Sequence, residues 1–433
     1  MAEEMEKTCA PVEIAPVFSA DPPRRRILGW LVIALPLFGQ TFSYMNGLWP
    51  LWALSKAFPV LSLPLVLYLM NQARFPMTRQ ILISFVWLLL LPSFSAVFYF
   101  HEGFFTSITA QVKLLPLLYF FSFLALLLQL QPTLHELERG FVRLAVAVVV
   151  ALIVLWAVIP GSWYQTSYVV GSSPLFTTDN RGHRIRMSMY FPIIALFFCY
   201  RRAFFERSLR YLTYALVVFA VTLLIVKTRA MIIGIVGVMA INTVRWSRPS
   251  IRVGLLVLAP VAAIGVFSFG YLATTFSTNA SSGFDVRFIT LQTALQFLGN
   301  NPLRWIFGVG TISPTSRDSL IAYFHHFFFL ADITWLGIVF EYGLIGALLF
   351  LLIELRGLAF YRRLHTEVQD DFLGALADYL VYVLVISFFY PPTLTPGESA
   401  IILAIFTYVW RVGGFDSKAI GTRNTQHAQP QTP

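Results

Sequence analysis

Two cations interrupt one of the most apolar stretches of this sequence. In FAVTLLIVKTRAMIIGIVGV, residues 219–238, Lys227 and Arg229 lie between two hydrophobic runs. A charge at membrane depth is costly unless it reaches the interface, pairs or has a function. Arginine offers a rigid fork of N–H donors that suits phosphate, and it stays charged when it is desolvated. The two cations therefore pose the question of whether they reach the interface, pair with carboxylates or lipid phosphates, or bind a ligand.

Three further arginines crowd the stretch TDNRGHRIRM, residues 178–187, as Arg181, Arg184 and Arg186. The apolar run that follows, Met187–Tyr200, has 14 residues and rises only ~21 Å as a helix. A membrane-spanning helix here is expected to extend backwards through Arg186 towards Arg184. Both guanidinium groups would then be drawn towards the membrane.

The only adjacent histidine pair is His325-His326. A neutral imidazole could act as a general base and take a proton from an attacking hydroxyl group. The alternative is an interfacial histidine in an aromatic belt, because Phe and Tyr surround the pair. Asp332, six residues beyond His326, could orient an imidazole or balance an arginine.

The sequence has no cluster of histidine, cysteine or carboxylate at metal-ligand spacing and no G-x-S-x-G hydrolase motif. Its two cysteines, Cys9 and Cys199, suggest no disulfide. No metal or cofactor is therefore expected. In an enzyme of this kind, arginines would supply the electrostatic stabilisation that a divalent cation supplies elsewhere.

The composition indicates which kind of secondary structure holds these residues in place. Of the 433 residues, 57% are hydrophobic and 12% are charged, whereas soluble globular chains carry roughly 25% charge. A helix needs ~20 residues to cross a bilayer, and apolar runs of this length recur along the chain. We predict an all-α polytopic membrane protein with about twelve transmembrane helices. The expected spans are 27–45, 48–70, 80–100, 114–130, 141–160, 187–200, 211–226, 230–244, 253–275, 333–354, 372–390 and 394–410.

Cytoplasmic loops of membrane proteins are rich in Lys and Arg. Most of the 31 cations fall inside if both termini are cytoplasmic, so the net charge of +10 is mainly an orientation signal that needs no nucleic acid. The predicted organisation is a cytoplasmic tail 1–26, helices over 27–275, a periplasmic loop 276–332, helices over 333–411 and a cytoplasmic tail 412–433. Lys227, Thr228 and Arg229 would then form the outer tip of a tight helical hairpin.

The remaining cations lie outside and defy the positive-inside trend. Several arginines at one leaflet suggest a polyanionic headgroup such as a lipid-linked diphosphate; the alternative is pairing with ordinary lipid phosphates or with Asp179, Asp285 and Asp318.

In the periplasmic loop, an amphipathic helix is expected with an apolar face of Phe288, Leu291, Leu295 and Leu298. The outer cations are Lys56, Lys113, Arg181, Arg184, Arg186, Lys227, Arg229, Arg287, Arg304 and Arg317.

The chain resembles the superfamily of O-antigen polymerases and O-antigen ligases of the bacterial envelope. The architecture is similar across nearly the whole chain, and three short motifs are similar as well. Thr228-Arg229-Ala230 resembles the family's Ser-Arg-small pattern at the start of a membrane helix, and FGVG resembles its Gly-x-Gly turn. HFFFLADITWLGIVFEYGLIG resembles the family's stretch from a histidine to a glycine, here Gly337, although Phe327 replaces the usual polar residue.

This resemblance implies a metal-independent, inverting glycosyl transfer at the periplasmic face of the bacterial inner membrane. Carried over by position, Arg229 and Arg186 would clamp the diphosphate of an undecaprenyl-linked glycan, and His326 would be the base. The acceptor would be a growing glycan in a polymerase or lipid A-core in a ligase; the weak ligase motif favours a polymerase. A chain-length regulator protein and membrane lipids would be partners. The expected substrate-binding residues are Arg287, Arg184, Arg181, Lys227, His325 and Asp332.

A flippase or another transporter of lipid-linked oligosaccharides is the main competing class. Transporters usually have charged or glycine-broken helices near the midplane. Only Glu341 and Asp378 suggest such positions here, and each could simply be paired inside the bundle. The more numerous outer arginines favour an enzyme of the outer leaflet. A non-enzymatic scaffold would leave the arginine-rich short helices unexplained.

Overall fold

The computed structural model of the chain describes residues 25–43, 45, 48–71, 75–166, 174–179, 182–247, 281–313, 320–326, 328–389 and 396–413. The described residues are mostly helical, as expected for a helical membrane protein. Within these residues, seven helical segments are long and apolar enough to cross a membrane. They are Trp49–Met70, Thr78–Phe100, Val112–Leu130, Leu134–Val158, Leu209–Val226, Arg229–Trp246 and Thr334–Glu367.

Eleven of the twelve predicted spans coincide with helices, and the span 253–275 lies outside the described residues. The twelve-span topology stays a prediction, because four of these helices have fewer than 18 residues. The first half of the chain contains α1 (Arg25–Phe38), α2 (Trp49–Leu61), α3 (Leu63–Met70), α4 (Thr78–Phe100), α5 (Phe104–Ala110), the 3-10 helix η1 (Val112–Leu118), α6 (Tyr119–Leu130), α7 (Leu134–Val158) and the 3-10 helix η2 (Gly161–Trp163).

The second half begins with a small sheet and returns to helices. Its elements are β1 (Gln165–Thr166), β2 (Phe176–Asp179), β3 (Gly182–Ile185), α8 (Tyr190–Glu206), α9 (Leu209–Val221), the π-helical turn η3 (Thr222–Val226), α10 (Arg229–Trp246), α13 (Ser281–Leu298), α14 (Pro302–Phe307), α15 (Leu320–Phe324), the 3-10 helix η5 (Leu330–Ile333), α16 (Thr334–Glu367), α17 (Asp371–Ile386) and α18 (Pro396–Val412).

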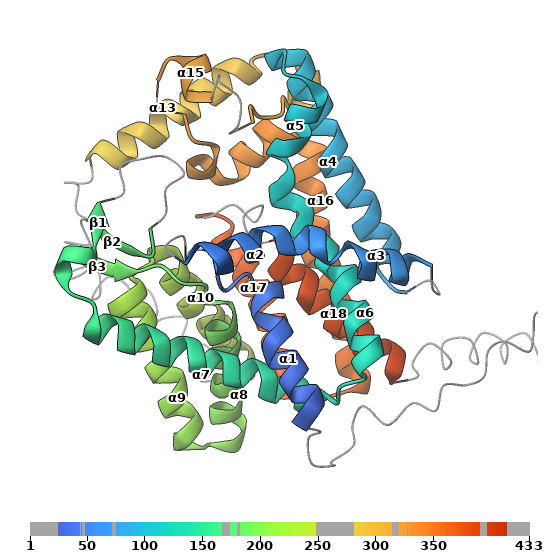
Figure 1. Ribbon diagram of the computed structural model, residues 1–433, viewed down its shortest axis with the longest axis vertical. Helices are drawn as coiled ribbons and strands as arrows, with labels where there is room; N and C mark the ends of the chain where they lie inside the picture. Colours follow the sequence, from blue (N-terminus) through green and yellow to red (C-terminus); the bar gives the residue numbers. More distant parts are fainter. Residues whose placement is uncertain are drawn as a thin grey trace, which may run out of the picture.

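The core lies where α18 packs against α6 and where α8 packs against α7 and α17. Ile401 to Ile405 of α18 are fully buried in succession, which is typical of a helix surrounded by other helices. By contrast, α7 exposes Val146, Val150 and Val154 on one side, as a lipid-facing helix does. In Figure 1, α13 and α15 lie at one end of the molecule and the turn between α8 and α9 lies at the opposite end.

Helix α16 is broken at Gly343, whose φ of 70° and ψ of 178° are not helical. The segment after α14 lies against this break, where the Val309 N–H donates to Phe340 O (2.7 Å) and the Gly310 N–H donates to Glu341 O (3.1 Å). A Cβ atom on Gly343 would lie 2.2 Å from Ile306 O. Glycine is therefore required there both for its positive φ and for the close approach of two backbones.

The prediction that the helix after Met187 extends backwards through Arg186 is wrong. Residues 182–185 form strand β3, and α8 begins at Tyr190 and continues forwards through Arg201 and Arg202 to Glu206. The forward extension is favourable because both arginines find carboxylates and aromatic rings inside the bundle. The sheet itself was not predicted, since its strands have only two to four residues.

The predicted helix in the loop exists as α13, but its predicted apolar face is only partly correct. Leu298 is buried as expected, whereas Phe288 and Leu295 are 59% and 42% exposed. Thr290 and Ala294 are fully buried in their place. Helix α13 packs against η5 and α16, and apolar periodicity alone does not tell which of its faces these elements cover.

Candidate functional site

The small sheet presents two chemically different faces. Strands β2 and β3 are antiparallel and pair Thr177 with Arg184 and Thr178 with His183. Strand β1 pairs in parallel with β2, and the sheet order is β1-β2-β3, so β3 is an edge strand. Because side chains alternate along a strand, Arg184 and His183 point to opposite faces.

The face with Arg184 is turned towards the turn between α9 and α10. Strand β3 packs against η3, and the side chain of Arg184 is buried. Gly182 lies on the same face as Arg184, and a Cβ atom on it would be 3.7 Å from Lys227 Nζ. Arg186 continues the pairing beyond β3 through its N–H, which donates to Leu175 O (2.8 Å). We call Arg184, Arg186, Lys227 and Arg229 the cationic cluster.

The predicted break between two helices at Lys227-Thr228 is confirmed, whereas the tight hairpin at an outer tip stays a prediction. The π-helical turn η3 ends at Val226, and Lys227 follows it with a φ of 53°. The Lys227 N–H donates to Thr222 O (2.9 Å), which closes the turn. Arg229 then opens α10, whose first N–H groups and dipole add positive potential at the same point. Local backbone geometry thus places Lys227 and Arg229 at the start of a helix, beside β3.

The sheet also gathers four aromatic rings on its second face. Tyr164 stacks on His183 with 4.4 Å between ring centroids and contacts Phe176 at 5.6 Å. Trp163 lies 6.4 Å from Phe176. Burial raises the pKa of the Tyr164 hydroxyl group, which keeps it a neutral donor. We call Trp163, Tyr164, Phe176 and His183 the aromatic face. This face was not predicted, because it depends on the pairing of strands that are too short to recognise in the sequence.

His326 belongs to a different part of the chain. Its Nε2 atom is 2.7 Å from Thr293 Oγ1 of α13, and its imidazole is partly buried. His325 is exposed and has a φ of 58°. Arg287 is exposed on α13, six residues before Thr293. We call the described residues of 281–333 the loop module; it contains His325, His326 and Arg287, whereas the cationic cluster lies on the sheet and α10.

Two predicted site residues are not described in full. Arg181 lies outside the described residues, and Asp332 lies in η5 with a side chain that is also outside the description. Arg304, one of the cations predicted to lie outside, has a structural role. Its guanidinium group donates to Phe297 O and lies over the rings of Tyr99 and Phe297.

The glycines of the family-like motifs have steric roles. Cβ atoms on Gly308 and Gly310 would lie 2.4 Å from Gly343 N and 2.3 Å from Pro92 O. A Cβ atom on Gly337 would lie 2.2 Å from Leu330 O. These contacts join the loop module to α4 and α16, so the motif glycines position the module around His326.

Glu341, a candidate midplane charge of a transporter, lies at the break in α16, and its partner Lys113 was not predicted. Both carboxylate oxygens of Glu341 are 2.7 Å from Lys113 Nζ, and Gln111 Nε2 donates to Glu341 Oε1 (3.0 Å). Tyr342 donates to Gln111 Oε1 (2.8 Å). The expectation that Glu341 is paired inside the bundle is confirmed. The position of Glu341 within a predicted span was the only feature of the sequence that indicated this pairing.

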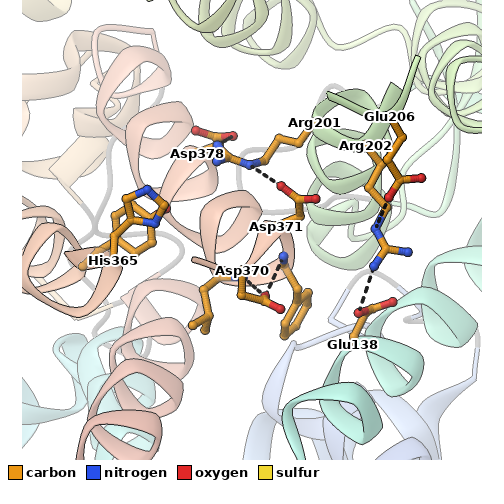
Figure 2. Close-up of polar contacts among 11 residues, drawn as sticks. Glu138, Arg201, Arg202, Glu206, His365, Asp370, Asp371 and Asp378 are labelled. Carbon is orange, nitrogen blue, oxygen red and sulfur yellow. Dashed lines mark hydrogen bonds and ion pairs between the residues drawn. The ribbon is translucent and has the colours of Figure 1, made fainter. Parts of the chain in front are cut away.

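The opposite end of the molecule holds a second charged network, shown in Figure 2. Arg201 Nη1 is 3.0 Å from Asp378 Oδ2, and Arg201 Nε is 3.8 Å from Asp371 Oδ1. Arg202 lies 3.8 Å from Glu138 and 3.6 Å from Glu206. We call these six residues the basal ion network. It connects α7, α8 and α17, and confirms that Asp378 is paired inside the bundle.

Asp370 lies beside this network and caps α17. Its Oδ1 atom accepts the N–H groups of Phe372 (2.8 Å) and Leu373 (3.0 Å). Burial raises the pKa of the Asp370 carboxyl group, and these two N–H donors oppose the rise. The cap satisfies N–H groups that the first turn of a helix leaves without intrahelical partners.

Among the described residues, no group of three or more histidine, cysteine and carboxylate side chains could hold a metal ion. The chain matches no protein-family model. No curated protein is significantly similar to it.

Proposed function

We propose that this protein is a membrane glycosyltransferase that uses an undecaprenyl-diphosphate-linked glycan as donor at the outer leaflet of the bacterial inner membrane. The observation that supports this most is the convergence of cations from two distant stretches. The β3 region contributes Arg184 and Arg186, and the turn before α10 contributes Lys227 and Arg229. Cations from separate elements raise the local positive potential, which suits a polyanion such as a diphosphate.

The reaction would use this potential selectively. As the acceptor hydroxyl attacks the anomeric carbon, the bond from that carbon to the diphosphate oxygen breaks and charge accumulates on the leaving diphosphate. Arg229 and Arg186 would stabilise this charge more in the transition state than in the ground state, which lowers the barrier. His326 would take the proton of the acceptor hydroxyl group.

A polymerase, with a growing glycan as acceptor, is the form of the reaction we favour, and a ligase with a lipid A-core acceptor is the alternative. Arg287 and His325 would contact the substrate from the loop module, together with Asp332. A chain-length regulator would act as a partner of a polymerase. Incubating the protein with purified donor and either acceptor separates the two forms, because each predicts a product of different mobility.

Donor consumption in proteoliposomes tests the proposal. Purified protein, lipid-linked oligosaccharide and acceptor should release undecaprenyl diphosphate in excess EDTA, because the arginines replace a metal in this mechanism. The Arg229→Lys variant should release much less undecaprenyl diphosphate, since it keeps the charge and loses the planar fork. A reaction that stops in EDTA and resumes with a divalent cation would contradict the arginine-only mechanism.

A flippase is the second candidate, and one observation favours it. Helix α16 is broken at Gly343 beside the partly buried pair Lys113–Glu341, and transporters often have their sites at such breaks. A flippase would move labelled lipid-linked oligosaccharide between leaflets with the glycan unchanged. The same proteoliposomes distinguish the two, because an enzyme releases the lipid diphosphate and a flippase does not.

A further inference from the structure

The aromatic face of the sheet is unexplained by diphosphate binding. Trp163 is 59% exposed, and His183 is exposed as well. Tyr164 and Phe176 hold these two side chains in place through ring contacts at 4.4, 5.6 and 6.4 Å. An exposed, ordered group of rings on a protein marks an interaction surface.

The chain folds in a way that fixes this surface. The 3-10 turn η2 is closed by the Trp163 N–H, which donates to Pro160 O (3.1 Å), and by the Tyr164 N–H, which donates to Gly161 O (3.2 Å). Gly161 lies against the His183 imidazole, where a Cβ atom would be 3.4 Å from Nε2. The rings are therefore presented by a short turn on a paired sheet, which reduces the conformational entropy lost on binding.

The polar side chains on this face indicate the chemistry of the ligand. Thr178 is paired with His183 and shares its face, and Thr166 is paired with Thr178 and lies on the same face. A pyranose ring has an apolar face of C–H groups, which stacks on the electron-rich face of an aromatic ring, and a rim of hydroxyl groups that need hydrogen-bond partners. An acyl chain would leave the polar partners unused.

We propose that the aromatic face binds the saccharide of the lipid-linked donor, directly beside the diphosphate. This inference rests on the proposed function. Its basis is the edge strand β3, on which His183 points to the aromatic face and the next residue, Arg184, points to the cationic cluster. A glycosyl diphosphate has its sugar bonded directly to phosphate, so a donor that passes around this edge meets both surfaces at once.

Kinetics of the Trp163→Ala variant provide the first test. Loss of a stacked ring should raise the KM for the donor roughly five- to tenfold, because an aromatic contact contributes on that scale. The kcat and the KM for the acceptor should stay within about twofold, and Trp163→Tyr should restore the donor KM. The matched control is Trp156→Ala, which removes a Trp of similar exposure (54%) from the membrane helix α7. An unchanged donor KM in Trp163→Ala would overturn the proposal.

A second measurement does not depend on turnover. Oligosaccharide released by mild acid from the envelope polysaccharide of the source cells is added to the protein in nanodiscs, and saturation-transfer NMR detects its ring C–H protons. We expect signals with the wild type and with Trp156→Ala, and at least a fivefold loss in the Trp163→Ala, Tyr164→Ala double variant. Equal signals in all three would overturn the proposal.

A third measurement tests the membrane interface as the alternative occupant. The fluorescence difference between the wild type and Trp163→Phe isolates Trp163, and brominated phospholipids quench a Trp that contacts acyl chains. Quenching by these lipids with no response to the oligosaccharide would make Trp163 a membrane anchor and overturn the proposal. If donor turnover is absent but the NMR signals depend on Trp163, the proposed function fails and the saccharide site stands.

Discussion

The basal ion network and the cationic cluster both use arginines, but in opposite ways. In the basal network, Arg201 lies between Asp378 and Asp371 and over the ring of Trp246, at 4.9 Å from its centroid. In the cationic cluster, the elements that carry Arg184 and Lys227 pack against each other. A cation paired with carboxylates of another helix holds the two helices together, whereas cations gathered from separate elements raise the positive potential at the place where they meet.

The largest effect should come from His326, because it would take part in the chemistry of the outer region. His326→Ala should lower transfer by ~10²- to 10⁴-fold, which is the usual contribution of a general base. The variant should insert and purify in normal amounts. Transfer is measured with purified donor and acceptor. His325→Ala is the control and should be milder, since His325 is exposed; a reversed order of the two variants would contradict the alignment of the motif.

Arg201→Ala should show that the basal network is structural. Removing one partner of a buried ion pair leaves the other charge uncompensated, which costs about 3–5 kcal/mol of stability. Thermal unfolding in detergent measures the loss, and transfer per folded molecule should stay within about twofold. Arg210→Ala on α9 is the control, since Arg210 is exposed. A stable Arg201→Ala variant with impaired transfer would reverse the roles of the two regions.

The Arg229→Lys variant tests the role of the cationic cluster. The variant keeps the positive charge and loses the fork that fits two phosphate oxygens, so transfer should fall by ~10²- to 10³-fold. Its thermal stability should equal that of the wild type. Arg245→Lys in the last turn of α10 is the matched control and should transfer normally. Transfer is measured with purified donor and acceptor. Normal transfer and normal glycan length in both Arg229→Lys and Arg229→Ala would leave Arg229 as a lipid anchor.

The smallest effect should be a pH dependence due to Asp370. Burial raises its pKa in the folded state, so the folded protein binds this proton more tightly than the unfolded chain does. Its contribution to stability is therefore complete below the ordinary aspartate pKa of about 4 and is lost as the pH rises through the raised value. The difference in melting temperature between the wild type and Asp370→Asn should follow this trend. A difference that does not change with pH would contradict it.

Much of the fold could be predicted from composition and local patterns. The long apolar runs indicated helices, and the break at Lys227 followed from the length of the stretch and the positions of its charges. The pairing of Glu341 and Asp378 was anticipated because isolated charges are costly inside a bundle. The partners Lys113 and Arg201 were not, because each lies more than 170 residues away in sequence.

The strands and the helix faces were harder to predict for a physical reason. A strand of two to four residues shows too few alternations to be recognised, so β3 was mistaken for the start of α8. On α13, apolar periodicity indicated an amphipathic helix, but it could not show that Thr290 and Ala294 would be buried ahead of Phe288. That choice depends on how closely the neighbouring helices approach.

The sequence by itself determined the helical membrane character, the charges available and the turn that presents Lys227 and Arg229. These properties depend on composition and on spacing within one element, which are local. Only the tertiary structure decided that Arg184 would join Lys227, that His183 would face the aromatic rings, and that α16 would break at Gly343 against the segment after α14. Those contacts join residues far apart in the chain, and they form because packed elements bury surface and satisfy each other's hydrogen bonds.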